Sequence, residues 1–172
     1  GGWGEVSAAG ILRQLSVKNG AQSDQAAGWG ISAAAKLLFG ADKQHDLRLM
    51  ATYGRGIGRY VGLNFAADAL LDPLTGKLET PGIFAGLAAA RFTIVPGLRT
   101  TVMGGYLNVD YPDGLAGLSG FNKRAWSAAA NLFYSPVKAL DLGVELRHGE
   151  RQLVDGSSGS LDRLEFAAKY SF

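Results

Sequence analysis

The chain has 172 residues, enough for one ordinary domain, and we treat residues 1–172 as a single unit. Its net charge of +2 and the lack of a basic run argue against a nucleic-acid partner. The absence of cysteine excludes a disulfide scaffold and any cysteine-based nucleophile or metal site. The 25 glycines follow no period, so a collagen-like chain is also excluded. We expect no metal and no cofactor.

The apolar residues are arranged with a period of two. Lys36 and Arg91 interrupt the apolar runs before they reach the roughly 18 residues of a spanning helix. In the last segment, by contrast, apolar and polar side chains alternate strictly, as in a strand with one apolar and one polar face. The pattern predicts eight such strands, over 3–15, 26–38, 46–58, 82–93, 97–110, 121–134, 138–150 and 161–172.

The first three strands introduce the features that recur along the chain. The strands 3–15 and 26–38 carry Arg13 and Lys36 on their polar faces. The strand 46–58 ends in a glycine-rich run that holds Arg55 and leads to Arg59 in the longest connection, 59–81. Alternating glycines here indicate a barrel rim more than a phosphate loop, because no helix start or Lys-Ser/Thr pair follows. If the connection folds inward, Arg55 and Arg59 are candidates for a constriction.

The remaining strands repeat the alternation. The strand 82–93 has small residues on its apolar face, Gly86, Ala88 and Ala90, which make it a candidate subunit interface or simply a lipid-facing surface. Aromatic residues lie toward the strand ends, as expected of the two membrane interfaces. The connections alternate between short and long, a pattern typical of bacterial outer-membrane barrels, and we expect 59–81, 109–120 and 151–160 outside the cell.

These strands predict an all-β, transmembrane, antiparallel up-and-down β-barrel. In hydrocarbon every backbone amide needs a partner within the protein, so spanning strands must close into a barrel. Eight strands could close alone around an interior filled with side chains. They could equally form the C-terminal half of a porin of about sixteen strands, whose other strands precede Gly1.

The C-terminus carries a recognisable signature. The ending Phe166–Phe172, with Tyr170 and the terminal Phe172, resembles the segment that the assembly machinery reads in Gram-negative outer-membrane proteins. Four further stretches resemble the DcaP-type trimeric porins: 28–31 (GWGI), 52–60 (TYGRGIGRY), 130–137 (ANLFYSPV) and 149–151 with 163–166. The resemblance implies a homotrimeric channel in the bacterial outer membrane that passes small anionic solutes such as dicarboxylates.

The polar faces are predominantly basic. A charged residue facing lipid near the midplane costs about 2–4 kcal/mol for Arg or Lys, so central charges are expected to face the lumen. Rings of Arg and Lys favour anions in pores. The pore-lining candidates are Arg13, Lys36, Arg48, Arg91, Arg99, Arg147, Arg163 and Lys169, with Arg151 nearer the rim. The alternative is a ladder of salt bridges, with Arg147 and Arg163 against Glu145 and Glu165.

Two classes of function compete, with a soluble barrel of lipocalin type as a weaker third. The first is passive diffusion of small anions, and the second is a structural or anchoring barrel with a plugged core. Catalysis is not expected, because His45 and His148 lie near strand ends without a ligand or nucleophile at suitable spacing.

Overall fold

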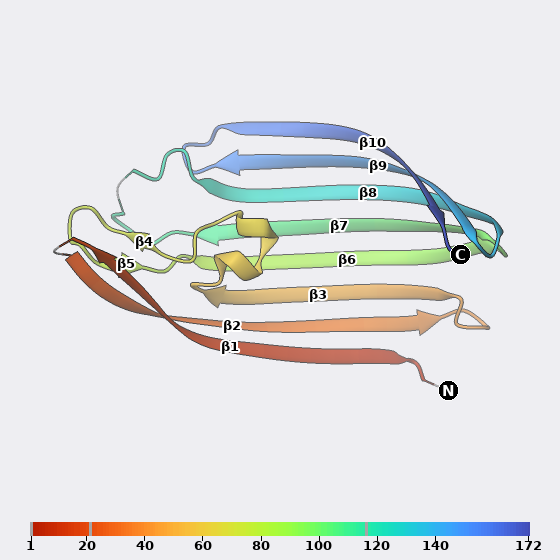
Figure 1. Cartoon of the computed structure of the whole chain (residues 1–172), viewed down its shortest axis with the longest axis horizontal. Coiled ribbons are helices and arrows are strands. Elements are labelled where there is room, and N and C mark those ends of the chain that lie inside the picture. Colours follow the sequence, from red (N-terminus) through yellow and green to blue (C-terminus); the bar gives the residue numbers. More distant parts are fainter. Residues whose placement is uncertain (1, 21, 116) are drawn as a thin grey trace.

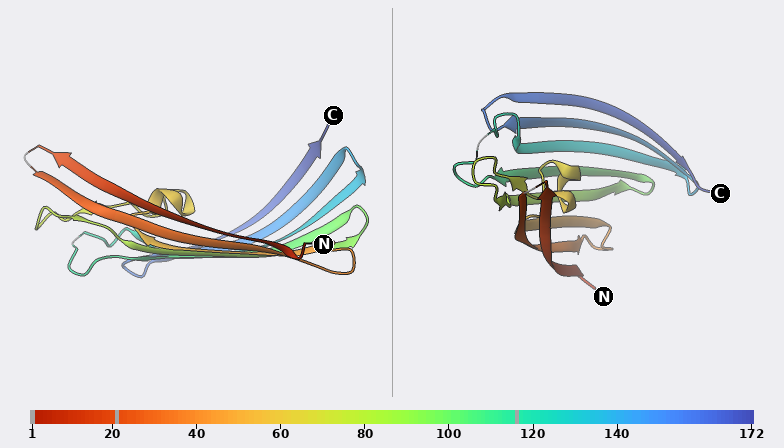
Figure 2. Two further views of the ribbon diagram at one scale, coloured as in Figure 1. Left: turned by 90° about the horizontal axis from the view of Figure 1, so that it is seen from below. Right: turned by 60° about the vertical axis from the view of Figure 1, so that its left-hand side comes forward.

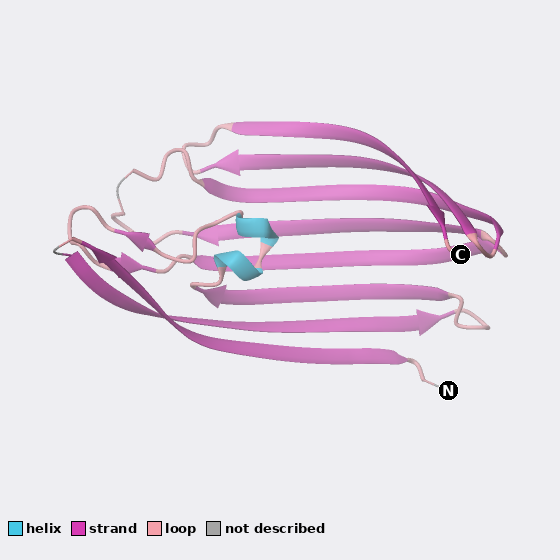
Figure 3. Cartoon of the chain, viewed as in Figure 1, coloured by secondary structure: helices cyan, strands magenta, loops and turns pink. Residues whose placement is uncertain are grey.

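A computed structural model describes residues 2–20, 22–115 and 117–172. These residues form an eight-stranded antiparallel sheet in the order β1-β2-β3-β6-β7-β8-β9-β10, with a separate β4-β5 pair (Figures 1 and 3). The long strands are β1 (Gly4–Asn19), β2 (Gln22–Phe39), β3 (His45–Arg55), β6 (Gly82–Val95), β7 (Leu98–Asp110), β8 (Asn122–Val137), β9 (Leu140–Leu153) and β10 (Ser158–Tyr170). Between β3 and β6 lie two 3-10 turns, η1 (Gly58–Tyr60) and η2 (Gly62–Asn64), then β4 (Leu70–Leu71) and β5 (Leu78–Glu79).

All eight expected strands are confirmed, but the connections after the first and seventh strands, which the alternation of short and long predicted to be long, are tight hairpin turns. β1 and β2 stay paired as far as Asn19 and Gln22, and β9 and β10 as far as Gln152 and Ser158. Their outer ends are polar, so the apolar alternation ends although the hydrogen-bonded ladder continues. Conversely, β3 stops at Arg55 instead of residue 58, because the chain turns at Gly56, which has a φ of 68°.

The sheet is strongly curved but open, with β1 and β10 as its edge strands (Figure 2). Its concave face carries η1 and η2 (Figure 2). At one end, which we call the long-loop end, lie the connections 56–81 and 111–121. The β1–β2 and β9–β10 hairpins also turn at this end (Figure 1). At the opposite, short-turn end lie the β2–β3, β6–β7 and β8–β9 connections and both termini (Figure 1). No helix in the described ranges is long and apolar enough to cross a membrane.

The pairing register separates apolar from charged residues, as predicted. On the last two strands, Val144 lies opposite Phe166 and Leu142 opposite Ala168. The intervening pairs are Glu145 with Glu165 and Arg147 with Arg163. Because neighbouring residues of a strand point to opposite faces, the first two pairs lie on the convex face and the last two on the concave face.

Aromatic rings on the convex face form a continuous diagonal line near the long-loop end. Trp29 and Tyr53 have ring centroids 5.7 Å apart, Phe84 and Tyr106 6.4 Å, and Trp126 and His148 5.3 Å. Tyr53 lies directly opposite Phe84, and Tyr106 directly opposite Trp126. Each of the three ring contacts, by contrast, joins residues that are two positions out of register, always toward the short-turn end.

This line measures how far the strands lean. Two residues per two strands is a shift of one residue per strand. With a rise of about 3.3 Å per residue and a strand spacing of about 4.8 Å, it corresponds to a tilt of about 35°. Transmembrane barrels have strand tilts of about 35–45°, so the line has the slope expected of an aromatic girdle lying level in a membrane.

The core lies under the inward-folded connection 56–81, not within the sheet. Its buried side chains come from the connection and from β6 and β7, namely Ile57, Val61, Ala66, Ile83, Leu107 and Val109. Gly62 sits so close to Leu107 that a Cβ there would lie 2.5 Å from its Cδ1. The connection is therefore packed onto the concave wall and does not extend into solvent.

Candidate functional site on the concave face

The structure brings the predicted basic residues onto one face. Lys36 lies opposite Arg48, and Arg147 opposite Arg163, in the same set of concave-face rows. The same alternation places Arg13, Arg91, Arg99 and Lys169 on this face. Arg55 is different: it pairs with Trp29 and Gly82 in convex-face rows. The expectation that Arg55 points into a constriction is therefore wrong. Arg55 lies two positions from Tyr53 on β3, so both side chains are on the convex face, away from the lumen.

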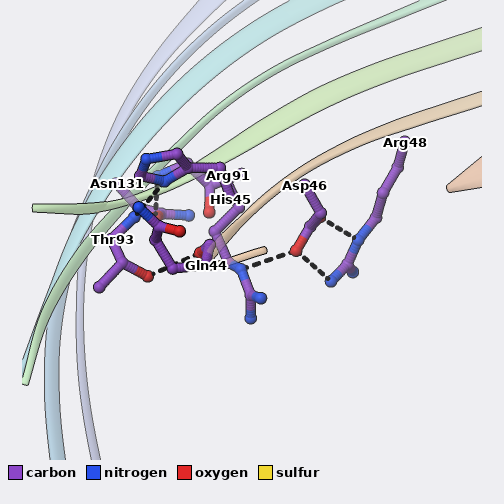
Figure 4. Close-up of polar contacts among 8 residues, drawn as sticks. Gln44, His45, Asp46, Arg48, Arg91, Thr93 and Asn131 are labelled. Atoms are coloured by element: carbon purple, nitrogen blue, oxygen red, sulfur yellow. Dashed lines mark hydrogen bonds and ion pairs between the residues drawn. The ribbon is translucent and has the colours of Figure 1, made fainter. Parts of the chain in front are cut away.

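A buried carboxylate at the start of β3 organises the strongest basic cluster (Figure 4). Asp46 accepts a hydrogen bond from Arg48 Nε at 2.7 Å, and its other oxygen lies 2.8 Å from Arg91 Nε. The Asp46 side chain is 1% exposed, whereas those of Arg48 and Arg91 are 51% and 39% exposed. The carboxylate therefore holds both arginines by their inner nitrogens and leaves guanidinium surface open to the concave side. We call Asp46, Arg48 and Arg91 the arginine clamp.

The chain on either side of Asp46 is fixed by contacts to the neighbouring strand. His45 Nδ1 accepts a hydrogen bond from the Thr93 amide at 3.2 Å, and Thr93 Oγ1 donates to the Gln44 carbonyl at 2.9 Å (Figure 4). The His45 ring also packs against Phe39 and Phe92. His45 thus fixes the backbone beside Asp46 at the short-turn end.

Three arginines on β7, β9 and β10 are engaged in ion pairs. Arg147 lies 2.7 Å from Glu145, Arg163 lies 2.7 Å from Glu165, and Arg99 lies 3.1 Å from Asp141. The salt-bridge ladder that the sequence left open is therefore present on this part of the sheet. In each of these pairs one acid faces one arginine, whereas in the arginine clamp two arginines share one buried carboxylate and Lys36 lies beside them.

A second charged cluster lies nearer the long-loop end, where the connection 56–81 meets β1. Arg13 donates to the Gly56 carbonyl at 3.0 Å and lies 3.0 Å from Asp68, while its guanidinium stacks over Tyr60, 5.3 Å from the ring centroid. Arg59, the other constriction candidate, also binds Asp68, from its amide at 2.8 Å and from Nε at 2.5 Å. Burial acts to raise the pKa of Asp68, but the hydrogen bonds from Arg59 and the charge of Arg13 outweigh it and lower the pKa below its usual value.

Two more hydrogen bonds tie the connection to the wall. Asp24 on β2 accepts from the Leu78 amide at 2.7 Å, and Asn122 donates to the Phe65 carbonyl at 2.7 Å. The apolar seat beneath, centred on Ile83 and Val109, was missed by sequence reasoning. The available signal was a series of apolar side chains at concave-face positions, since Leu87 on β6 and Leu107 on β7 share the parity of Ile83 and Val109.

Comparison with known proteins agrees with this arrangement. No protein-family model and no curated protein matches the chain. Among solved structures, the outer membrane channel DcaP of Acinetobacter baumannii superposes with a TM-score of 0.79 and 26% sequence identity over 99% of the chain. The chain has the fold of a DcaP-type outer-membrane porin. The NanC porin also matches, with a TM-score of 0.53, 12% identity and 96% of the chain covered, which supports the fold alone.

The DcaP-type fold places the chain in the bacterial outer membrane, embedded in lipid. The chain spans about half of the DcaP channel, since the match covers 47% of that chain. The match to NanC covers 79% of the NanC chain. A DcaP-type porin wall requires one lipid-facing and one water-facing surface. The convex face with its aromatic line and the concave face with its charges meet that requirement.

Proposed function

We propose that this chain forms part of the wall of an outer-membrane porin that passes small solutes and prefers anions. The observation that carries the preference is the arginine clamp. Its single carboxylate is buried and neutralises one charge, while two half-exposed guanidinium groups and the neighbouring Lys36 face the concave side. Guanidinium groups bind carboxylates through paired hydrogen bonds, which favours dicarboxylate-like solutes among the anions.

Selectivity in a salt gradient tests the proposal. The protein, reconstituted in planar bilayers, is expected to show a reversal potential of the sign for anion preference. Replacing Arg48 and Arg91 together by Ser is expected to reduce the anion-to-cation permeability ratio several-fold, because charges within about 8 Å of an ion act on it at physiological salt.

A matched control removes equal charge where the clamp is not affected. Lys77→Ser with Lys138→Ser takes two positive charges from exposed connections and is expected to leave the ratio near that of the unaltered protein. Cation preference in the unaltered protein would contradict the proposal and would indicate that Glu145, Glu165 and Asp141 control permeation.

A structural barrel with a plugged core is the second candidate, favoured by the packing of the connection 56–81 onto the concave wall. It predicts no conductance for the unaltered protein and measurable conductance once residues 58–79 are replaced by a short glycine-serine linker. Assembly into homotrimers, delivery through the assembly machinery by Tyr170 and Phe172, and a non-catalytic role complete the proposed description.

A further inference from the structure

We propose that a hollow on the concave face, basic at one end and apolar at the other, binds a monocarboxylate with an apolar body, such as an aryl or medium-chain alkyl carboxylate. The inference rests on the proposed anion path and adds to it the recognition of an apolar group. A dicarboxylate would place its second charge where this hollow presents apolar atoms.

Met50 on β3 and Leu87 on β6 lie at the centre of the hollow. They are directly opposite each other in a concave-face row, and they are 47% and 49% exposed. The interior of a water-filled barrel is ordinarily polar, so two large apolar side chains exposed on this face depart from the pattern. Exposed apolar surface rimmed by polar residues is typical of a ligand-binding groove.

Toward the short-turn end, Met50 and Leu87 border a space of about 350 Å³ that also contains charged side chains. Lys36 and Arg48 lie directly opposite each other on β2 and β3, and Arg48 is one concave-face step from Met50. Glu5, opposite Lys36 on the edge strand β1, lines the same space. The apolar pair is therefore in direct continuity with the basic residues of the proposed anion path.

The charges of this end favour one carboxylate. Lys36, Arg48 and Arg91 carry three positive charges against the two carboxylates of Glu5 and Asp46, which leaves one positive charge in excess. Asp46 is buried and faces the two arginines (Figure 4), so of these two acids only Glu5 is open to a solute. Ammonium and guanidinium groups bind a carboxylate through charge-assisted hydrogen bonds, which are the strong ones.

Toward the long-loop end, Met50 and Leu87 border a second space, of about 370 Å³, beside the inward-folded connection. The sheet contributes Leu107 and the hydroxyl-bearing Ser127, and the connection contributes Tyr60, Val61 and Phe65. The Tyr60 side chain is 60% exposed, with Arg13 stacked on its ring. Ligand sites commonly combine apolar and aromatic walls with a few placed polar groups, and the two spaces joined at Met50 and Leu87 have this composition.

The spacing of the rows sets the size of the solute. Successive concave-face residues of one strand are about 7 Å apart. The row of Lys36 and Arg48 is therefore about 7 Å from Met50, and about 13 Å from the next row, which contains Leu107. A carboxylate held at the basic end thus needs an apolar body about 7–13 Å long to lie on Met50 and Leu87 and approach the connection.

Isothermal titration calorimetry of the detergent-purified protein tests the hollow, with hexanoate and gluconate as probes and protein-free micelles as the blank. Both probes are six-carbon monocarboxylates, but gluconate carries hydroxyl groups along its body. We expect hexanoate to bind roughly tenfold more tightly than gluconate, because only an apolar body gains by leaving water on Met50 and Leu87.

Met50→Gln with Leu87→Asn makes the centre of the hollow polar at nearly constant size and is expected to abolish the preference for hexanoate while gluconate still binds. Lys36→Gln is expected to weaken both probes equally. Leu161→Asn is the matched control, because Leu161 lies in the same concave-face row as Leu87 but on the edge strand β10. It should bind both probes as the unaltered protein does, and circular dichroism verifies that each variant retains its β-sheet.

Three results would overturn the proposal: equal affinity of the unaltered protein for the two probes, an unchanged preference in the double variant, or an equal loss in Leu161→Asn. Absence of binding by either probe would also overturn it and would indicate that a further segment of the protein covers Met50 and Leu87. Failure of the proposed function is detected separately, because the titration needs no current and the reversal potential is measured without either probe.

Discussion

At the scale of single residues, burial distinguishes acids that otherwise look alike. Asp46 and Glu165 both sit two residues from an arginine on the concave face, each with a carboxylate oxygen 2.7 Å from that arginine. Asp46 is buried between two strands, whereas Glu165 lies on an edge strand with both partners exposed. Exposed pairs contribute about 0–1 kcal/mol, so only the first should matter to stability.

Asp46→Asn is therefore expected to lower the free energy of unfolding by about 1–3 kcal/mol, since hydrogen bonds to charged groups are worth that much when a partner is lost. Urea unfolding from lipid vesicles measures it. Glu165→Gln is the matched control and should stay within about 1 kcal/mol of the unaltered protein. Equal effects of the two variants would show that burial is not what distinguishes them.

At the scale of elements, the connection 56–81 is the part held by the most varied contacts. Its apolar residues pack on β6 and β7, and Asp68 joins it to β1 through Arg13. Because the pKa of Asp68 is lowered in the folded state, its contribution is present at neutral and mildly acidic pH. The contribution is lost only as the pH falls through that lowered pKa.

Asp68→Asn is expected to loosen this connection at neutral pH, with cleavage by trypsin at Arg59 becoming about tenfold faster or more. Limited proteolysis followed by mass spectrometry measures it. Lowering the pH to mildly acidic values should not loosen the unaltered connection, as amide hydrogen exchange of residues 57–68 can show. Protection that fades between neutral and mildly acidic pH would rule out Asp68 as the responsible group.

The elements also show where the sequence is sufficient and where it is not. The strands and their facing follow from alternation, because lipid and water select opposite residue types on the two faces of each strand. The inward fold of 56–81 does not, because Ile57 and Ile83 meet only in three dimensions. Ion pairing is equally hidden: Arg48 and Arg147 look alike in sequence, but only Arg48 shares its acid with an arginine from another strand.

At the scale of the whole molecule, the open sheet has a lipid-type and a water-type surface, and the chain contains no cysteine. Single cysteines can therefore report each surface without background. Residues Arg163 and Phe166 on β10 lie three positions apart and so on opposite faces.

A cysteine at Arg163 is expected to react with a charged, membrane-impermeant maleimide, and a cysteine at Phe166 only with a lipid-soluble one. Labelling of the reconstituted protein followed by gel shift or mass measurement checks this. Equal labelling of both positions by the charged reagent would contradict a lipid-facing convex surface. The variants Leu146→Cys, on the convex face, and Arg147→Cys, on the concave face, repeat the test on the neighbouring strand β9.

The tilt of the strands determines how much of the molecule stands clear of the bilayer. Crossing an apolar band about 25 Å tall at about 35° takes roughly nine residues of strand. β2 has 18 residues and β1 has 16, so close to half of each lies in water. The part of these strands outside the bilayer is thus a stiff, hydrogen-bonded wall, which presents side chains at fixed positions well beyond the level of the hydrocarbon.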